Sequence, residues 1–196
     1  ALTARAPRGI TVRLPRVTSV ARGTSADVPV EVSVARGTPA GSYRVPLSFA
    51  GREVTLTVRA FPRTGGPDLV AGAKATSSGD VGPDSSARAA ADGDPASRWT
   101  PSPGDGPWWQ AELAGPARVG RVVLQWQGAG AGHYAVRVST DGRSWRTAAT
   151  VEGGRGGRES VPMDAVDARF LRIEVLGRAS GADCSLWSVE AYAVEH

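Results

Sequence analysis

The sequence predicts an all-β protein made of two domains, each a β-sandwich. Short runs alternate apolar and other residues with a period of two, which is typical of half-buried strands; the clearest runs are 43–49, 54–58, 134–138 and 171–175. Clusters rich in glycine and proline separate these runs, and no long amphipathic helix is visible. All six tryptophans lie between Trp99 and Trp187, so the two halves of the chain differ in composition. That difference favours two domains.

The N-terminal domain is expected over residues 1–62. Its run 37–49 combines small residues, Gly, Ser and Tyr with an apolar alternation, and it is similar to a hairpin of the immunoglobulin-like modules of bacterial glycosidases. Such a sandwich needs about 100 residues and seven strands. We therefore expect an immunoglobulin-like spacer that is truncated at its N-terminus. Residues 63–67 have the composition of a linker, and the second domain is expected over 68–196.

Composition excludes several classes of partner. The net charge is +4, but the arginines are scattered and form no basic stripe, so we expect no nucleic-acid partner. No apolar run approaches the ~18 residues that span a bilayer, and we expect no membrane partner. Cys184 is the only cysteine, so no internal disulfide can form, and both a buried and a reactive thiol remain open.

Residues 91–99 are the most informative stretch of the chain. Within six residues they hold the carboxylates of Asp92 and Asp94, the turn residue Gly93 and the hydroxyl of Ser97. Calcium binds six to eight oxygens, and a short acidic loop bent by glycine supplies several of them. An ordinary Asp-Gly turn is the alternative.

Five segments of the C-terminal part of the chain follow one another in an order that is typical of a known domain: 107–113, 119–126, 134–145, 168–175 and 185–192. On these segments, residues 68–196 resemble the discoidin or coagulation-factor C-type domain, and most closely the family 32 carbohydrate-binding modules of bacterial glycoside hydrolases. The resemblance implies a galactose-binding-like jelly-roll β-sandwich.

The resemblance also implies a structural calcium ion between the acidic loop and the last strand. Its implied ligands are the backbone of Ala89, the side chains of Asp92, Asp94, Ser97 and Glu190, and the carbonyl of Ala191.

A glycan site is implied at the end of the sandwich away from calcium, where the loop 127–133 lines it. Gln127 stands where the family often has an acid, so it would not pair with a cationic amino sugar. His133 either donates to a sugar hydroxyl or caps its strand. The expected ligand-binding residues are Trp108, Trp126, Gln127, His133 and Asp183.

Tryptophans are expected in two roles. Trp99, Trp109 and Trp145 are most simply core residues, because large indoles fill volume in a small sandwich. Trp108, Trp126 and Trp187 border loops, where an indole either stacks on a sugar ring or joins the core.

No nucleophile elbow, metalloprotease motif or phosphate-binding loop is present, so we expect no catalysis by this chain. The expected function is that of a monomeric, non-catalytic region of a secreted, extracellular bacterial glycoside hydrolase, which binds glycan and holds the catalytic domain near its substrate. The alternatives are a protein- or membrane-adhesion module of the discoidin type, a purely structural accessory domain, and a small enzyme.

Overall fold

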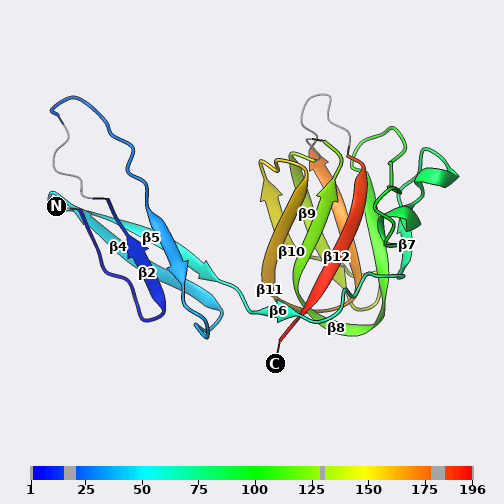
Figure 1. The fold of residues 1–196 in the computed structure, drawn as a ribbon, viewed down its shortest axis with the longest axis horizontal. Helices are drawn as coiled ribbons and strands as arrows, with labels where there is room; N and C mark the ends of the chain where they lie inside the picture. The colour runs from blue at the N-terminus through cyan, green and yellow to red at the C-terminus, as the bar shows by residue number, and fades with distance from the viewer. Residues whose placement is uncertain (1, 16–20, 129–130, 178–183, 196) are drawn as a thin grey trace. The chain divides into compact units, whose positions relative to one another are not determined.

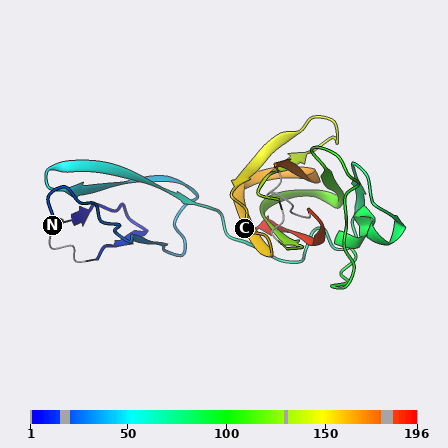
Figure 2. The same cartoon turned by 90° about the horizontal axis from the view of Figure 1, so that it is seen from above.

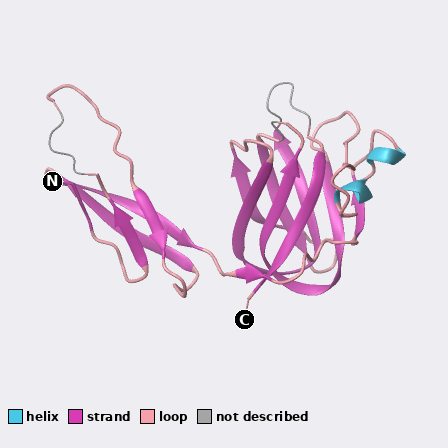
Figure 3. Cartoon of the chain, in the orientation of Figure 1, coloured by secondary structure: helices cyan, strands magenta, loops and turns pink. Residues whose placement is uncertain are grey.

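The structure, a computed structural model, describes residues 2–15, 21–128, 131–177 and 184–195. The chain divides into two compact units, unit 1 from Ala1 to Phe61 and unit 2 from Pro62 to His196 (Figure 1). Strands dominate both units, and the two short 3₁₀ helices, η1 (Pro83–Ser85) and η2 (Ala87–Ala90), belong to unit 2 (Figure 3). Within the described ranges, no helix has the length and apolar character needed to cross a membrane. The predicted all-β class is confirmed.

Unit 1 consists of two small antiparallel sheets, β1-β4-β5 and β2-β3. Alternation places the apolar residues of β4 and β5 on one face, where Val45 lies opposite Leu56 and Leu47 lies opposite Val54. Val45 is fully buried, whereas Val54 is 67% exposed, so this face is only partly covered. The strands are β1 (Leu2–Ala4), β2 (Ile10–Arg13), β3 (Glu31–Val34), β4 (Gly41–Phe49) and β5 (Arg52–Ala60).

Unit 2 is a jelly-roll sandwich whose strands form one continuous antiparallel network. The order across the network is β10-β9-β11-β8-β12-β6, and β7 also pairs with β8. The strands are β6 (Thr64–Gly65), β7 (Lys74–Ser77), β8 (Trp108–Trp126), β9 (His133–Ser139), β10 (Arg146–Glu152), β11 (Arg158–Gly177) and β12 (Leu186–Val194).

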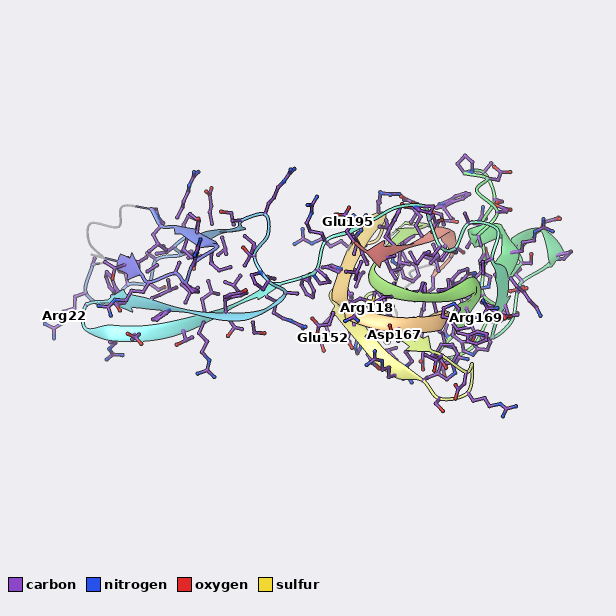
Figure 4. All side chains as sticks on the ribbon, turned by 90° about the horizontal axis from the view of Figure 1, so that it is seen from below. Arg22, Arg118, Glu152, Asp167, Arg169 and Glu195 are labelled. Atoms are coloured by element: carbon purple, nitrogen blue, oxygen red, sulfur yellow. The ribbon has the colours of Figure 1, made fainter. Side chains whose placement is uncertain are left out.

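The two longest strands, β8 and β11, each belong to both layers of the sandwich. The first half of β8 pairs with β7 and with the second half of β11, and its second half pairs with β12 and with the first half of β11. Register shifts in β11 between Pro162 and Val166 and between Ala168 and Phe170 mark the bend. Figure 2 shows the strands of unit 2 arranged around one centre, and the buried side chains of this unit form one core. Arg118 and Asp167 lie opposite each other between the two register shifts, and both are labelled in Figure 4.

Part of the predicted linker 63–67 is a strand. Thr64 and Gly65 form β6, which pairs with Val194 and Ala193 of β12. Gly120 permits the close approach of β6, because a Cβ there would lie 2.7 Å from the Thr64 Cγ2. A linker composition therefore did not prevent these residues from adding to a sheet edge.

The core of unit 2 contains three fully buried indoles, those of Trp99, Trp109 and Trp126. Trp99 and Trp109 were predicted as core residues, and this is confirmed. Trp126 is 1% exposed, and its ring centroid lies 5.2 Å from that of Tyr134. The expectation that Trp126 offers an exposed stacking face is therefore wrong, because alternation along β8 directs Val122, Leu124 and Trp126 inward together.

The outer face of the sheet carries the other aromatic cluster, which sequence reasoning missed. The guanidinium of Arg172 lies 4.4 Å from the Trp108 ring and 4.1 Å from the Trp145 ring. Its Nη2 donates to the Gln110 Oε1 at 2.8 Å. Trp145 is partly exposed, so the prediction of a core role is wrong; Trp108 is also partly exposed, but it stacks on an arginine. Alternation on β8 and β11 could have placed Gln110 and Arg172 together.

A fragment starting at Pro62 should fold and unfold cooperatively on its own, because unit 2 has its own core and keeps β6. A fragment starting at Asp68 should be less stable by about 1–3 kcal/mol, because it loses the hydrogen bonds between β6 and β12. Urea unfolding of the two fragments measures the difference. Equal stability would show that β6 contributes nothing to unit 2.

Replacement of Trp126 and of Trp145 by alanine should lower the free energy of unfolding by different amounts, because the first indole is buried in the core and the second is partly exposed. Trp126→Ala should cost about 3–5 kcal/mol of unfolding free energy, because it empties buried volume. Trp145→Ala should cost about 1–2 kcal/mol, because it removes one face of the stack on Arg172. Denaturant unfolding of both variants tests the ranking, and a Trp145→Ala cost equal to that of Trp126→Ala would contradict it.

Candidate functional site

The acidic loop after η2 gathers oxygen atoms around the Ser97 hydroxyl. Its Oγ lies 3.0 Å from the Ala89 carbonyl oxygen, 2.9 and 3.0 Å from the two carboxylate oxygens of Asp92, and 3.1 Å from the Asp94 carbonyl oxygen. A hydroxyl has one proton, so it can satisfy only one of these acceptors at a time. Around the Ser97 hydroxyl, the loop therefore holds more hydrogen-bond acceptors than donors. These acceptors are carboxylate and carbonyl oxygens, the ligand atoms that hard cations prefer.

Local hydrogen bonds shape this loop. The Asp94 amide donates to the Asp92 Oδ1 at 2.9 Å, and the Ala96 amide donates to the Asp94 Oδ1 at 2.9 Å. Gly93 has a φ of 78°, in the left-handed region that favours glycine. The Asp94 carboxylate is thus committed partly to its own turn, whereas its carbonyl points to Ser97.

Glu190 lies in an ion pair instead of joining the loop oxygens. Arg158 donates from Nη1 and Nη2 to its two carboxylate oxygens at 2.9 and 3.1 Å, and the Tyr192 hydroxyl donates to its Oε2 at 2.7 Å. Partial burial opposes ionisation of Glu190, but the hydrogen bonds from Arg158 and Tyr192 outweigh it and lower its pKa. The Ala191 carbonyl accepts from the Leu69 amide at 2.9 Å.

Strand register explains why Glu190 contacts Arg158 and not the oxygens of the acidic loop. Arg158 of β11 pairs with Gln125 of β8, and Glu190 of β12 pairs with Val123 of β8, so the two charged side chains come from the two strands that flank β8 and meet across it. Across the described part of the chain, no three His, Cys, Asp or Glu side chains converge on a common point that could hold a metal ion. The predicted trio of Asp92, Asp94 and Glu190 is accordingly not assembled here.

A groove of about 300 Å³ lies between the acidic loop and the start of β12. One wall is the indole of Trp187, whose ring has the Arg98 guanidinium 5.0 Å from its centroid. The groove combines this aromatic wall with three carboxylates. Its acidic lining residues are Asp68, Asp94 and Glu190.

The loop end of unit 2 is defined as the described residues 127–128, 131–133, 153–157 and 184–185. Main-chain hydrogen bonds join its loops: the Gln127 amide donates to the Ser185 carbonyl at 2.9 Å, and the Gly157 amide donates to the Gly128 carbonyl at 3.2 Å. The Gly153 amide donates to the Gly132 carbonyl at 2.7 Å. Three segments that are far apart in the sequence are thereby fixed against one another.

The buried Tyr134 and the partly exposed Glu159 form a side-chain pair that supports the loop end. The Tyr134 hydroxyl donates to the Glu159 Oε2 at 2.6 Å, and the Arg155 and Gly156 amides donate to the Glu159 Oε1. Burial raises the pKa of Tyr134, and the hydrogen bond to Glu159 raises it further. The Glu159 carboxylate therefore links the loop 153–157, through Oε1, to Tyr134 of β9, through Oε2.

Two of the predicted ligand-binding residues lie at the loop end. Gln127 follows the last residue of β8, and its Oε1 is buried without a hydrogen-bond partner among the described residues. His133 is partly exposed at the first position of β9. Trp108 is on the outer sheet face and Trp126 is in the core, so neither offers an indole face there. Asp183 lies outside the described residues.

Solved structures of carbohydrate-binding modules are similar to unit 2. Chitosan-binding module 1 of a chitosanase/glucanase from Paenibacillus sp. IK-5 is 31% identical, with a TM-score of 0.62 over 65% of this chain and 100% of that one. Module 2 of the same enzyme, solved with chitotriose, is 28% identical, with a TM-score of 0.58 over 64% of this chain and 100% of that one. A Clostridium perfringens family 32 module in complex with GalNAc-β-1,3-galactose shares the fold at 21% identity, with a TM-score of 0.58 over 65% of this chain and 100% of that one.

A curated relative is similar over a shorter segment. A polysaccharide lyase 8 family protein of Enterococcus faecalis is 33% identical over 88 residues, which cover 43% of this chain and 6% of that protein. The model of the F5/8 type C domain matches residues 72–189, more than half of the 196 residues. The chain therefore belongs to the F5/8 type C, or discoidin-like, domain family.

Proposed function

We propose that unit 2 binds a glycan at its loop end, and that the chain is a non-catalytic accessory region of a secreted bacterial carbohydrate-active enzyme. The observation that carries the proposal is the 28–32% identity to chitosan-binding modules over 98–100% of their lengths. Tethering raises the effective concentration of an attached catalytic domain at its substrate, so weak binding at one site suffices.

The geometry of the loop end supports this location. Its loops are already joined by main-chain hydrogen bonds, so a ligand would not have to order them on binding. Gln127 offers an amide with both donor and acceptor atoms, and His133 offers a ring nitrogen, which are the groups that read sugar hydroxyls. The buried Gln127 Oε1 accepts no hydrogen bond from a described residue, and a sugar hydroxyl would supply a donor for it.

The loop end favours an uncharged sugar over a cationic amino sugar. Gln127 carries no charge, and Glu159 already accepts three hydrogen bonds within the protein. The described residues of the loop end include no carboxylate that could pair with an ammonium group, which would lose hydration there. We therefore propose neutral or N-acetylated sugars as the ligand class.

Gln127→Ala should weaken glycan binding about tenfold, because one hydrogen-bonding amide is worth about 1.4 kcal/mol in affinity. The melting temperature should change little, because Gln127 follows the strand and leaves the core intact. Calorimetry measures binding of N-acetylated chitotriose, with chitosan trisaccharide as the charged comparison and a glycan array if neither binds.

Gln125→Ala is the matched control, because Gln125 is two residues away on the outer face of β8. Equal binding by the Gln127→Ala variant and the unmodified chain would move the glycan site elsewhere. The same measurement on Trp187→Ala examines the groove beside the acidic loop as the alternative position.

We also propose that the acidic loop binds calcium in a structural role. The oxygen ligands that fit are the carbonyls of Ala89 and Asp94, the carboxylate of Asp92 and the hydroxyl of Ser97, because these oxygens already converge. A bound ion would supply the positive charge that the crowded acceptors lack and would hold the loop after η2 in place.

Calcium should raise the melting temperature of the chain relative to a chelator, because an ion that binds the folded state stabilises it by mass action, by about 2.7 kcal/mol at a hundredfold excess over its dissociation constant. Asp92→Ala should abolish the effect. Asp84→Ala, an exposed aspartate in η1, should retain it. Identical melting curves in calcium and chelator, with no metal detected by elemental analysis, would disprove the site.

A further inference from the structure

The layer of unit 2 that contains β7, β9, the first half of β8 and the second half of β11 carries aromatic and polar side chains on its outer face. Alternation directs Trp108 and Gln110 of β8 and Arg172 of β11 outward, whereas Trp109 between the first two is buried. The segment before β10 adds Trp145. We call Trp108, Gln110, Trp145 and Arg172 the outer-face cluster. All four are partly exposed, so a ligand can reach them.

Contacts within the cluster hold the Arg172 guanidinium and leave one of its edges open. Arg172 lies over both indoles, and its Nε and Nη2 donate to the Gln110 Oε1 at 3.2 and 2.8 Å. Nη1 donates to no residue that the structure describes. The edge formed by Nη1 and the second N–H of Nη2 therefore keeps two parallel donors, which is the geometry that binds a carboxylate through both of its oxygens.

Arg172 also differs from the other arginines of β9 and β11 in its charge balance. Each of the other three pairs with a carboxylate: Arg137 with Glu174, Arg158 with Glu190 and Arg169 with Glu112. Arg172 forms no ion pair within the described ranges. Burial is the largest influence on its pKa and lowers it, because the charged form loses hydration. A bound anion would compensate this charge.

We propose that the outer-face cluster binds the carboxylate of a uronic acid in an acidic glycan. The carboxylate accepts from Nη1 and Nη2 of Arg172, and the sugar ring contacts the exposed parts of the Trp108 and Trp145 indoles. These indoles favour a sugar carboxylate over a small inorganic anion, because only the sugar brings apolar surface to them.

This site is distinct from the loop end, and it does not depend on the glycan site proposed there. Arg172 lies opposite Arg137 of β9, whereas His133 of the loop end is the first residue of that strand. The strand between them separates the two sites by about 13 Å. The two sites also differ in chemistry, because the loop end is proposed to take uncharged sugars.

Calorimetry with the full chain tests the site, with a trimer of galacturonic acid as the probe and its methyl ester as the neutral comparison. The ester should bind at least about tenfold more weakly than the acid, because methylation removes the charge that pairs with Arg172. Arg172→Lys should weaken binding of the acid by a similar factor, because an ammonium group keeps the charge but lacks the two parallel donors. Circular dichroism confirms that each variant is folded.

Gln110→Glu is a second variant, which leaves Arg172 and both indoles in place. It gives the guanidinium a carboxylate of its own, so binding of the acid should weaken at least about tenfold while the melting temperature is not lowered. Arg169→Lys is the matched control, because it makes the same substitution on the same strand at an arginine that already pairs with Glu112; Arg169 is labelled in Figure 4. This control should bind the acid as the unmodified chain does.

Four results would overturn the proposal. The first is equal binding, or no binding, of the acid and its ester, and the second is unchanged binding of the acid by the folded Arg172→Lys variant. The third is binding of a sulfated trisaccharide that contains no uronic acid in place of the galacturonate, which would assign the cluster to sulfate esters. The fourth is displacement of the acid by N-acetylated chitotriose, which would place both ligands at one site.

Discussion

The pairing of β8 with β11 is the interaction on which the rest of unit 2 depends. The two strands run antiparallel along most of their lengths, and every other strand of the unit except β10 and β6 pairs directly with one of them. Because β8 and β11 bend, this one pair of strands belongs to both layers of the sandwich. A single hydrogen-bonded network of strands therefore encloses the core. This network also positions the two candidate sites. The acidic loop ends at Trp99, which forms a bridge with Leu186 of β12, and the segments of the loop end connect β8 to β9, β10 to β11 and β11 to β12.

Sequence reasoning predicted the class of fold and the strands more reliably than the orientation of individual side chains. The alternation in 43–49 and 134–138 marked β4 and β9 directly. The exchange of roles between Trp126 and Trp145 was not predictable from loop proximity. Trp126 points inward because it continues the alternation of Val122 and Leu124 along β8, whereas the position of Trp145 depends on an arginine from a distant strand that stacks on it.

The candidate sites show the same limit. Local contacts assemble the Asp92–Ser97 loop, so its residues could be named from their spacing alone. Glu190 could not, because its partner Arg158 is 32 residues away and becomes a neighbour only through the pairing of β8 with both β11 and β12. Arg172 was missed for a similar reason: its position between two indoles combines β8, β11 and the segment before β10.

The addition of β6 to β12 has a consequence for modular architecture. It brings the two ends of unit 2 together at one pole, while β12 runs from there to Leu186 beside the loop end at the other pole (Figure 1). Nine residues of strand separate the poles by about 30 Å. A module with this geometry can be inserted into a host protein or repeated in tandem, because its covalent attachments leave from the pole opposite the loop end.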